Sequence, residues 1–425
     1  MRMMPSHRLL TLLMSGLLSS PLLADEYRYT NILVGDRASG MGGAYTAISD
    51  DPSGLYYNPA GVAYAPSSSI SASVNAYQTT HTTYKAALGG TRDWTRTSST
   101  LLPNFFGIIQ PLGDGVLGFS YAVPDNILED QDQHFTNFAS AAGTIESYTI
   151  NFNQNDSTYK FGPSYATSLS DRLSIGATLY YHYRDLQRIQ NEYVVLANEH
   201  GGGYEWSNSY FESSEHGLEP RLGVMWSASE RVALGASLSR TFILRSQTTL
   251  QQTYHIDAHL ANGMLADAQY HPQTDSHQDK RGFPLNLRLG AAWFYSDRLL
   301  LSADYSRHTS NSYQFGGGTI TQIAVNDFAL GMEYYPYNTL AVRLGAYTSH
   351  ANTPKIGANS VNQAEHVNML GITGSLTRYT RNSSLSLGMG YTSGSGRAQL
   401  FANTTSYQEV EANSMTVFLS TSYSY

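Results

Sequence analysis

The chain has no cysteine among its 425 residues, and only 14% of its residues are charged. The absence of cysteine excludes both disulfide bonds and a lipid-modified N-terminal cysteine. The mean hydropathy of −0.30 excludes a bundle of transmembrane helices, since each span would need about 20 apolar residues. The formal net charge of −8 comes with no basic stripe, so no nucleic-acid partner is expected.

The first 24 residues have the composition of a secretory signal peptide. Arg2 and Arg8 supply positive charge, an apolar stretch follows at 9–18, and Ala24 is a small residue at the end. This pattern predicts cleavage after Ala24 and export of the chain from the cytoplasm. We therefore expect a signal peptide at 1–24 and a mature chain that begins at Asp25.

From about residue 67 onward, apolar and small polar residues alternate with a period of two. The run that begins at residue 173, for example, reads LSIGATLYYHY. Such alternation predicts β-strands with one apolar and one polar face. In a soluble β-sandwich the apolar faces would form the core. In a membrane barrel they would face lipid, and the small polar residues would line the lumen.

The connections between these runs decide between the two folds. Short polar turns alternate with long segments, which is typical of outer-membrane barrels. The six short turns fall at 113–115, 170–172, 229–231, 296–298, 337–338 and 381–382. We predict an all-β fold, a transmembrane antiparallel barrel of about 14 strands over residues 66–425, with roughly 9–13 residues in each strand. The strands should begin near residues 67, 99, 115, 156, 173, 214, 232, 282, 299, 321, 339, 365, 383 and 411.

An even number of strands places both ends of the barrel in the periplasm, as in barrels of the bacterial outer membrane. The 32 tyrosines suit the aromatic girdles of such barrels, where an amphipathic ring lies between lipid and water. The last run, from Met415 to Tyr425, alternates and ends in an aromatic residue. It resembles the recognition signal of the barrel-assembly machinery. The expected partners are therefore this machinery and outer-membrane lipid, and the expected state is a monomer.

Residues 25–65 lack the period of two and are rich in glycine and alanine. A cluster of Gly40, Gly42 and Gly43 precedes the turn Asn58-Pro59-Ala60. Such a segment, between a signal peptide and a barrel, resembles the FadL/TodX family of outer-membrane transporters for long-chain fatty acids and other hydrophobic compounds. The resemblance extends over the mature chain. It implies a hatch at 25–65 inside the barrel and passive uptake of hydrophobic molecules.

The same segment also looks like another group of barrels. The sequence from Arg37 to Gly61 is similar to that of PorV-type barrels, which serve protein secretion or surface attachment. Such a barrel would bind proteins and not lipids. The hatch motif therefore indicates the superfamily, and the sequence leaves transport and secretion open.

In the FadL/TodX family the third and fourth extracellular loops form an apolar groove that captures the substrate. The resemblance assigns this part to loops at about 187–205 and 250–281. Their apolar residues are Val194, Val195 and Leu196 in the third loop and, at helical spacing, Ile256, Leu260, Met264 and Leu265 in the fourth. The same side chains could instead pack the loops onto the barrel rim, and both interpretations stay open.

A carboxylate ligand would need a cation in the lumen, and Lys160, Arg184 and Arg240 are the candidates. The alternative is that these three are solvated lumen charges. His255 and His259 are four residues apart, as on one face of a metal-binding helix, but no zinc-protease motif surrounds them and no metal is predicted. No catalytic motif of specific spacing occurs, so neither an enzyme nor a cofactor is expected.

The mechanism that the resemblance implies needs no ATP. Loops collect the ligand, a pocket between hatch and wall holds it, and either a shift of the hatch or a gap in the wall releases it. In the family the early part of the wall opens laterally. Gly118, Pro124 and Pro163 are the candidates for a kink or bulge there, because glycine and proline interrupt regular strand pairing.

Overall fold

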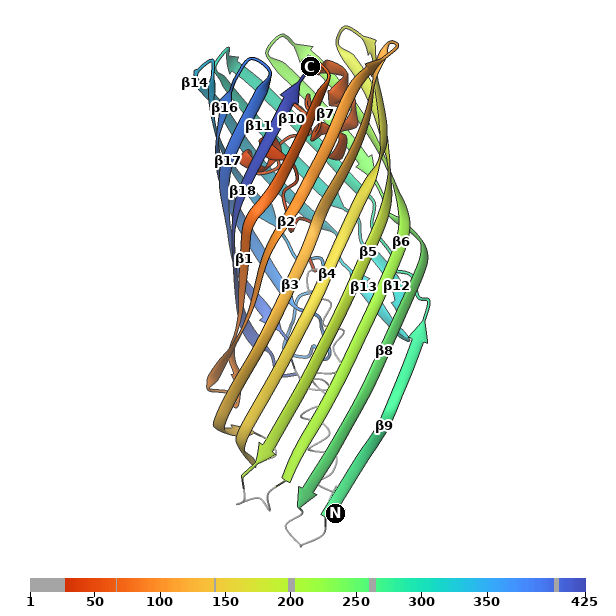
Figure 1. The fold of residues 1–425 in the computed structure, drawn as a ribbon, viewed down its shortest axis with the longest axis vertical. Coiled ribbons are helices and arrows are strands. Elements are labelled where there is room, and N and C mark those ends of the chain that lie inside the picture. Colours follow the sequence, from red (N-terminus) through yellow and green to blue (C-terminus); the bar gives the residue numbers. More distant parts are fainter. Residues whose placement is uncertain (1–26, 66, 141–142, 198–202, 260–264, 401–404) are drawn as a thin grey trace.

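The computed structural model describes residues 27–65, 67–140, 143–197, 203–259, 265–400 and 405–425. Sixteen strands form one sheet, and the pairing of β5 with β6 closes it into a barrel (Figure 1). The strands from the first half of the chain are β1 (Ser69–Leu88), β2 (Arg92–Leu112), β3 (Gly115–Ser140), β4 (Gly143–Ser170), β5 (Leu173–Leu196), β6 (Gly203–Ser229), β7 (Val232–Ser239) and β8 (Phe242–His259). The others in the barrel are β9 (Leu265–His277), β10 (Asn286–Ser296), β11 (Leu299–His308), β14 (Val325–Tyr337), β15 (Leu340–Ser349), β16 (His366–Tyr379), β17 (Ser383–Ala398) and β18 (Gln408–Ser424).

These sixteen strands make a barrel of 14, because two of its strands are interrupted. Both β7 and β8 pair with β6, and only Arg240 and Thr241 separate them. In the same way β10 pairs with β7 and β9 pairs with β8, with an irregular stretch at 278–285 between them. The predicted number of strands is therefore confirmed. A separate hairpin consists of β12 (Asn311–Phe315) and β13 (Gly318–Gln322).

All six predicted short turns lie at one end of the barrel, at the top in Figure 1. We call this the turn end and the opposite end the loop end. In outer-membrane barrels the short turns are periplasmic, so the turn end faces the periplasm. The first strand, β1, pairs with the last, β18, from Ser69↔Ser424 onward. Both ends of the barrel chain therefore meet at the turn end, as the even strand number predicts.

The expected strand length of 9–13 residues is wrong for the tall side of the barrel. β3, β4 and β6 contain 26, 28 and 27 residues. A row of neighbouring outer aromatic residues, Tyr121, Tyr159 and Tyr183, crosses β3, β4 and β5. Beyond that row the outer face is polar, as in the hydrogen bond from Asn208 to Asn191. The strands thus continue past the membrane. There the outer face is polar as well, so apolar and polar residues do not alternate in the sequence.

The two faces of the wall differ as the alternation predicts. Leucines on the outer face are widely exposed, for example Leu330 at 61% and Leu387 at 59%. Between them, side chains such as Ser302, Ser386 and Thr377 point inward and are buried. This arrangement matches a barrel whose outer band contacts lipid and whose lumen is polar, and it places the protein in an outer membrane.

Two loop assignments are corrected by the structure. The segment taken as the third loop, 187–205, continues β5 as far as Leu196, and β6 already begins at Gly203. The segment taken as the fourth loop contains β8 and β9 where helical spacing was expected. Four apolar residues at helical spacing can occur in a strand by chance. The pairing of β8 with β6 extends along the whole of β8, and so short a window of sequence does not reveal it.

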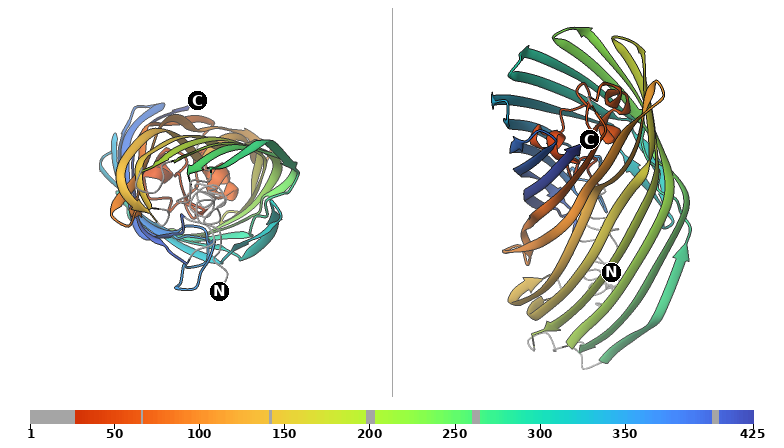
Figure 2. Two further views of the ribbon diagram at one scale, coloured as in Figure 1. Left: turned by 90° about the horizontal axis from the view of Figure 1, so that it is seen from below. Right: turned by 45° about the horizontal axis from the view of Figure 1, so that its top comes forward.

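Residues 27–65 lie inside the ring of strands near the turn end (Figures 1 and 2). This N-terminal segment contains three short helices, α2 (Asp36–Gly40), α3 (Gly54–Tyr57) and the 3-10 helix η1 (Pro59–Tyr64). Within the described part of the chain, no helix has the length and apolarity needed to span a membrane.

A charge placed in the outer apolar band should destabilise the barrel. For Leu387→Arg we expect a loss of about 2–4 kcal/mol in the free energy of folding, because arginine is costly at the bilayer midplane. Urea titration of refolding into short-chain phosphatidylcholine bilayers measures it. Gln110→Arg is the control, since Gln110 is exposed beside the β2–β3 turn, where the cost falls to about 0–1 kcal/mol. Equal losses in both variants would contradict this assignment of the lipid face.

Candidate functional site

The N-terminal segment bridges the lumen from one wall to the other. Helix α2 contacts β15, β16, β17 and β18, whereas η1 contacts β3, β4, β5 and β6 on the other side. Its larger side chains, among them Met41, Tyr45 and Tyr57, are almost fully buried in one apolar cluster with wall residues. Several of these wall residues are small, including Ala122, Ala233 and Ala292. Large side chains of the segment thus pack against small ones of the wall.

The Asn58-Pro59-Ala60 turn is held by the amide of Asn58. Its Oδ1 accepts a hydrogen bond from the Ala60 N–H at 3.2 Å, which caps η1. Its Nδ2 donates to the carbonyls of Thr46, at 2.8 Å, and of Val224 in β6, at 3.0 Å. Pro59 begins η1, where its fixed φ suits a helix and its missing N–H costs nothing. A buried asparagine with three partners therefore joins two parts of the segment to the wall.

Close approach explains the glycines of the predicted motif. Gly42 and Gly43 have φ values of +65° and +80°, which side-chain-bearing residues rarely adopt. A Cβ on Gly42 would also lie 2.9 Å from the backbone nitrogen of Ala346 in β15. A Cβ on Gly40 would lie 3.2 Å from the Cβ of Arg343. The segment thus touches the wall backbone at Gly42 and wall side chains at Gly40.

Charged groups tie α2 to β14 and β15. Arg37 donates to both carboxylate oxygens of Glu333, at 2.8 and 2.7 Å, and to Asp50 at 2.6 Å. Arg343 donates to the same Glu333 at 2.6 Å. Such bidentate pairs are strong when shielded from water. Asp36 accepts a bond of 2.6 Å from the Ser386 hydroxyl.

Burial shifts the ionisation of groups in the segment. Removal from water raises the pKa of the Asp36 carboxyl group, and the Arg343 guanidinium and the Ser386 hydroxyl counteract part of that rise. Burial also raises the pKa of Tyr57 well above its usual value. The Tyr57 hydroxyl therefore stays protonated, and it accepts a bond of 3.1 Å from the Val34 N–H.

A second anchor lies on β11. One carboxylate oxygen of Asp304 accepts hydrogen bonds from the Tyr45 N–H at 3.1 Å, the Thr46 N–H at 2.9 Å and the Thr46 hydroxyl at 2.5 Å. Ser302, two residues earlier, donates to the Ala44 carbonyl at 2.8 Å. Residues 44–46 are thus held through their own backbone groups by side chains of β11. Their main chain therefore has a defined position on this side of the lumen.

The barrel wall has a break between β2 and β3. Ser98 pairs with Glu129 and Phe105 pairs with Ala122, but the described residues between them, 99–104 and 123–128, have no pairing with each other. Pro103 lies on one side and Pro124 on the other, and proline cannot donate to a strand pair. Of the three kink candidates, Pro124 lies at this irregularity, while Gly118 and Pro163 keep the register of β3 with β4.

The N-terminal segment covers this break from inside. The Ile32 N–H donates to the Pro124 carbonyl at 3.3 Å. The Asn104 side chain on β2 donates to the Leu33 carbonyl at 3.0 Å. Residues 32 and 33 therefore supply hydrogen-bond partners to both edges of the break.

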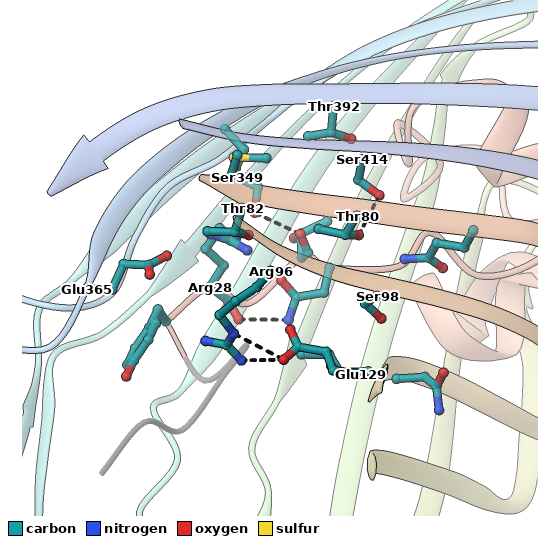
Figure 3. A pocket seen from close by; sticks show the side chains of 18 of the residues that line it. Arg28, Thr80, Thr82, Arg96, Ser98, Glu129, Ser349, Glu365, Thr392 and Ser414 are labelled. Carbon is teal, nitrogen blue, oxygen red and sulfur yellow. Dashed lines mark hydrogen bonds and ion pairs between the residues drawn. The ribbon is translucent and has the colours of Figure 1, made fainter. Parts of the chain in front are cut away.

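Residues 27–31 continue along the lumen toward the loop end and separate two cavities. Arg28 pairs with Ala351, and the Asn352 N–H donates to the Tyr27 carbonyl at 2.7 Å. The first cavity, of about 90 Å³, lies against β1–β3 and β15–β18 (Figure 3). The second, of about 140 Å³, lies against β3–β7, β10, β11 and β13. Arg28 and Asn31 line both cavities.

The first cavity is lined by neutral polar groups and balanced charges. Figure 3 shows the hydroxyls of Thr80, Ser98 and Ser414 around it. Arg96 donates to Glu129 at 3.1 and 2.6 Å, so the charges of this pair compensate each other. Few of its lining side chains are aliphatic.

The predicted loop residues do not form one groove. Val194 and Leu196 are buried in an apolar cluster at the loop end, together with Trp94, Ile150 and Phe152 among others. Val195 is half-buried on the other face of β5. Ile256 and Leu265 belong to β8 and β9, while Leu260 and Met264 lie outside the described residues. The helical premise for His255 and His259 is wrong too, since both are in β8.

The three predicted cations lie in different surroundings. Lys160 lines the larger cavity and donates to Glu219 at 2.5 Å. Arg184 is buried in an ion pair with Asp156, at 2.7 and 2.6 Å. Arg240 is exposed at the break between β7 and β8 and donates to the Phe283 carbonyl at 3.1 Å. Only Lys160 and Arg240 therefore border a cavity.

Sequence analysis missed several residues of the larger cavity. Arg28 and Tyr29 come directly after the expected cleavage site, where no pattern distinguishes them. His182, Arg288 and His308 are on inward positions of β5, β10 and β11. The period of two placed Arg288 on the polar face. Its position beside residues from distant strands depends on barrel closure. Within the described ranges, no group of three or more metal-binding side chains occurs.

Removal of the Asn58 amide should loosen the N-terminal segment without unfolding the barrel. For Asn58→Ala we expect a loss of about 1–3 kcal/mol in local stability, because buried partners are left unsatisfied. Amide hydrogen exchange should become faster at residues 44–64 and unchanged in β16–β18. Asn382→Ala, which removes an exposed bond to Ser424, is the control. Unchanged exchange in Asn58→Ala would show that the turn does not hold the segment.

No protein-family model and no curated protein sequence matches the chain. Solved structures do match it. A Pseudomonas aeruginosa FadL homologue is 13% identical, with a TM-score of 0.63 over 93% of this chain and 99% of that one. The toluene transporter TodX of P. putida is 13% identical, with a TM-score of 0.64 over 93% and 99%. The toluene transporter TbuX of Ralstonia pickettii is 14% identical, with a TM-score of 0.60 over 93% and 99%.

These likenesses extend over nearly the whole length of each chain, although the identities are low. They agree with the resemblance to the FadL/TodX family that the glycine cluster and the Asn58-Pro59-Ala60 turn indicated in the sequence. In architecture, the chain has the 14-stranded barrel fold of the FadL and TodX channels.

Proposed function

We propose that this protein is an outer-membrane channel for passive uptake of hydrophobic compounds such as long-chain fatty acids, with residues 27–65 as a hatch. The observation that carries the proposal is the position of residues 32 and 33. They bond to both edges of the β2–β3 break, at Pro124 and Asn104. The same segment fills the turn end of the lumen and covers a lateral opening, so its displacement would open either route.

The route begins at the loop end of the barrel. There molecules leaving the lipopolysaccharide layer would enter past the buried apolar cluster around Trp94, Phe152 and Leu196. Two cavities follow, on either side of residues 27–31. Ile127 and Glu129 of β3 line the first cavity and lie next to the β2–β3 break. A ligand in this cavity is thus close to a lateral exit into the membrane.

The similar structures support the same function. Two of them carry the description of toluene transporters, and another is described as a FadL homologue. Transport by this chain needs no catalytic residues, and we propose that it is not an enzyme. We propose also that it works as a monomer and that its terminal strand, β18, is recognised by the barrel-assembly machinery.

The hatch hypothesis can be tested with a reversible cross-link, because the chain has no cysteine of its own. In the pair Asp36→Cys and Ser386→Cys, the substituted side chains are in contact, at 2.6 Å in the native protein. Oxidation joins α2 to β17. We expect uptake of a radiolabelled fatty acid or of toluene into proteoliposomes to fall to background after oxidation and to recover with a reductant.

The matched control joins two strands of the wall. Ser384→Cys and Ser422→Cys replace hydroxyls that are 2.7 Å apart on β17 and β18. Their oxidation should leave uptake unchanged. Uptake that persists in the oxidised Asp36–Ser386 pair would contradict a moving hatch. If no hydrophobic compound is taken up by the native protein and a secreted protein co-purifies with it, the PorV-type function replaces the present proposal.

A further inference from the structure

The larger cavity, which we call the basic chamber, has an unusual charge for a hydrophobic route. Its lining contains two carboxylates, Asp125 and Glu219, and a larger set of cations. These cations are Arg28, Lys160, Arg221, Arg240, Arg281 and Arg288. The chamber lies where the wall is interrupted between β7 and β8 and between β9 and β10. The breaks turn irregular backbone and its side chains toward the lumen.

Some of these cations are compensated by carboxylates. Glu219 accepts hydrogen bonds from Lys160 at 2.5 Å and from Arg221 at 2.7 Å. Arg281 donates to Glu215 at 2.6 Å. One carboxylate thus serves two cations, which leaves the chamber net positive.

Arg288 differs from these three. Among the described residues, no carboxylate lies within ion-pair distance of it, and its Nε is buried without a hydrogen-bond partner. The buried Asp304 carboxylate interacts with it electrostatically from farther away, and accepts its own hydrogen bonds from residues 45 and 46. Its guanidinium lies 5.4 Å from the centre of the Tyr57 ring. A guanidinium that lines a cavity without an ion-pair partner can hold an anion through its remaining N–H groups.

Two buried histidines add further polar atoms. His182 is 1% exposed, and neither of its ring nitrogens has a hydrogen-bond partner within the described ranges, although its Nε2 lies 4.0 Å from the Glu215 carboxylate. His308 is 6% exposed, and the same holds for its Nδ1. His182 meets the Phe283 ring edge-on at 5.6 Å, and His308 stacks on Tyr29 at 4.0 Å. The chamber therefore combines flat aromatic surfaces with several unmatched polar atoms.

Buried polar atoms are rarely left without partners, because that costs free energy. An alkyl chain in the chamber would leave Arg288 and the two histidines unsatisfied. A small molecule with several oxygen atoms would offer them partners, and its aromatic ring would meet Tyr29 and Phe283 of the lining. The neighbouring cavity, with its balanced Arg96–Glu129 pair, has no such preference for an anion.

We propose that the basic chamber binds a small oxygen-rich aromatic carboxylate, whose carboxylate pairs with Arg288 and whose hydroxyl groups meet His182 and His308. This inference rests on the proposed uptake function and specifies its cargo. The chamber then adds an anionic aromatic ligand to the hydrophobic compounds of the proposed uptake function.

Isothermal titration of the detergent-solubilised full chain tests the proposal. The probe is 3,4-dihydroxybenzoate, and its matched analogue is 4-methylcatechol, in which a methyl group replaces the carboxylate. We expect the benzoate to bind at least about tenfold more tightly, since a hydrogen-bonded charge pair shielded from water contributes this much or more. Toluene and palmitate, titrated in parallel, should bind more weakly than the benzoate.

Variants identify the residue that holds the anion. Arg288→Gln should weaken binding of the benzoate about tenfold and leave 4-methylcatechol unchanged, while Arg288→Lys should retain most of the affinity. Arg378→Gln, at an exposed position on β16, is the control and should have no effect. Heat-modifiable mobility on gels checks that each variant is folded. Equal binding of the two catechols, or benzoate binding that Arg288→Gln does not change, would overturn the proposal.

Uptake into proteoliposomes separates this inference from the proposed function. If toluene or palmitate is taken up and the benzoate neither binds nor enters, the inference fails and the uptake function stands. If the benzoate binds through Arg288 and no compound enters, the chamber is a binding site and the uptake function fails. If no probe binds, the chamber holds only water and the inference is wrong.

Discussion

The pairing of every strand with two neighbours is the constraint on which this structure depends. In lipid an unpaired backbone group has no water to bond with, so a spanning sheet must close on itself. Here closure joins β1 to β18, whose partners are more than 300 residues apart along the chain. Once the ring is closed, alternate residues point outward to lipid or inward to the lumen. The polar lumen, the N-terminal segment and the cavities all follow from that.

The same constraint gives meaning to the places where pairing fails. The wall is broken between β2 and β3, and again where β7 meets β8 and β9 meets β10. At the first break the backbone of residues 32 and 33 makes one hydrogen bond to each edge. At the second, Arg240 bonds to the Phe283 carbonyl across the interruption. Both breaks border cavities, so the wall is weakest beside the spaces that could hold a ligand.

The N-terminal segment is held by apolar packing and by polar contacts together. Large residues such as Tyr45 and Tyr57 pack against small residues of the wall, while ion pairs and hydrogen bonds fix the position of the segment. Glu333 accepts hydrogen bonds from both Arg37 and Arg343. Asp304 accepts hydrogen bonds from the backbone N–H groups of residues 45 and 46. Polar contacts of this kind can be exchanged for contacts with water or ligand at a modest net cost.

The sequence by itself determined the wall. The period of two and the six short turns are local patterns, so they were sufficient to predict a 14-stranded barrel and its lipid-facing side chains. The glycine cluster and the Asn58 turn were likewise visible as local motifs. The same local rules misjudged the strands beyond the membrane, because β8 has no apolar face there to reveal its period.

The tertiary structure alone decided the interior. Arg37 meets Glu333 across 296 positions of the chain, and no local pattern predicts that contact. The basic chamber brings Arg28 together with Lys160, Arg288 and His308, each of which looked like an isolated polar residue in its own segment. Strand alternation states only that such residues point inward. Which of them meet is set by strand order, register and closure, since these bring distant segments to the same height in the lumen.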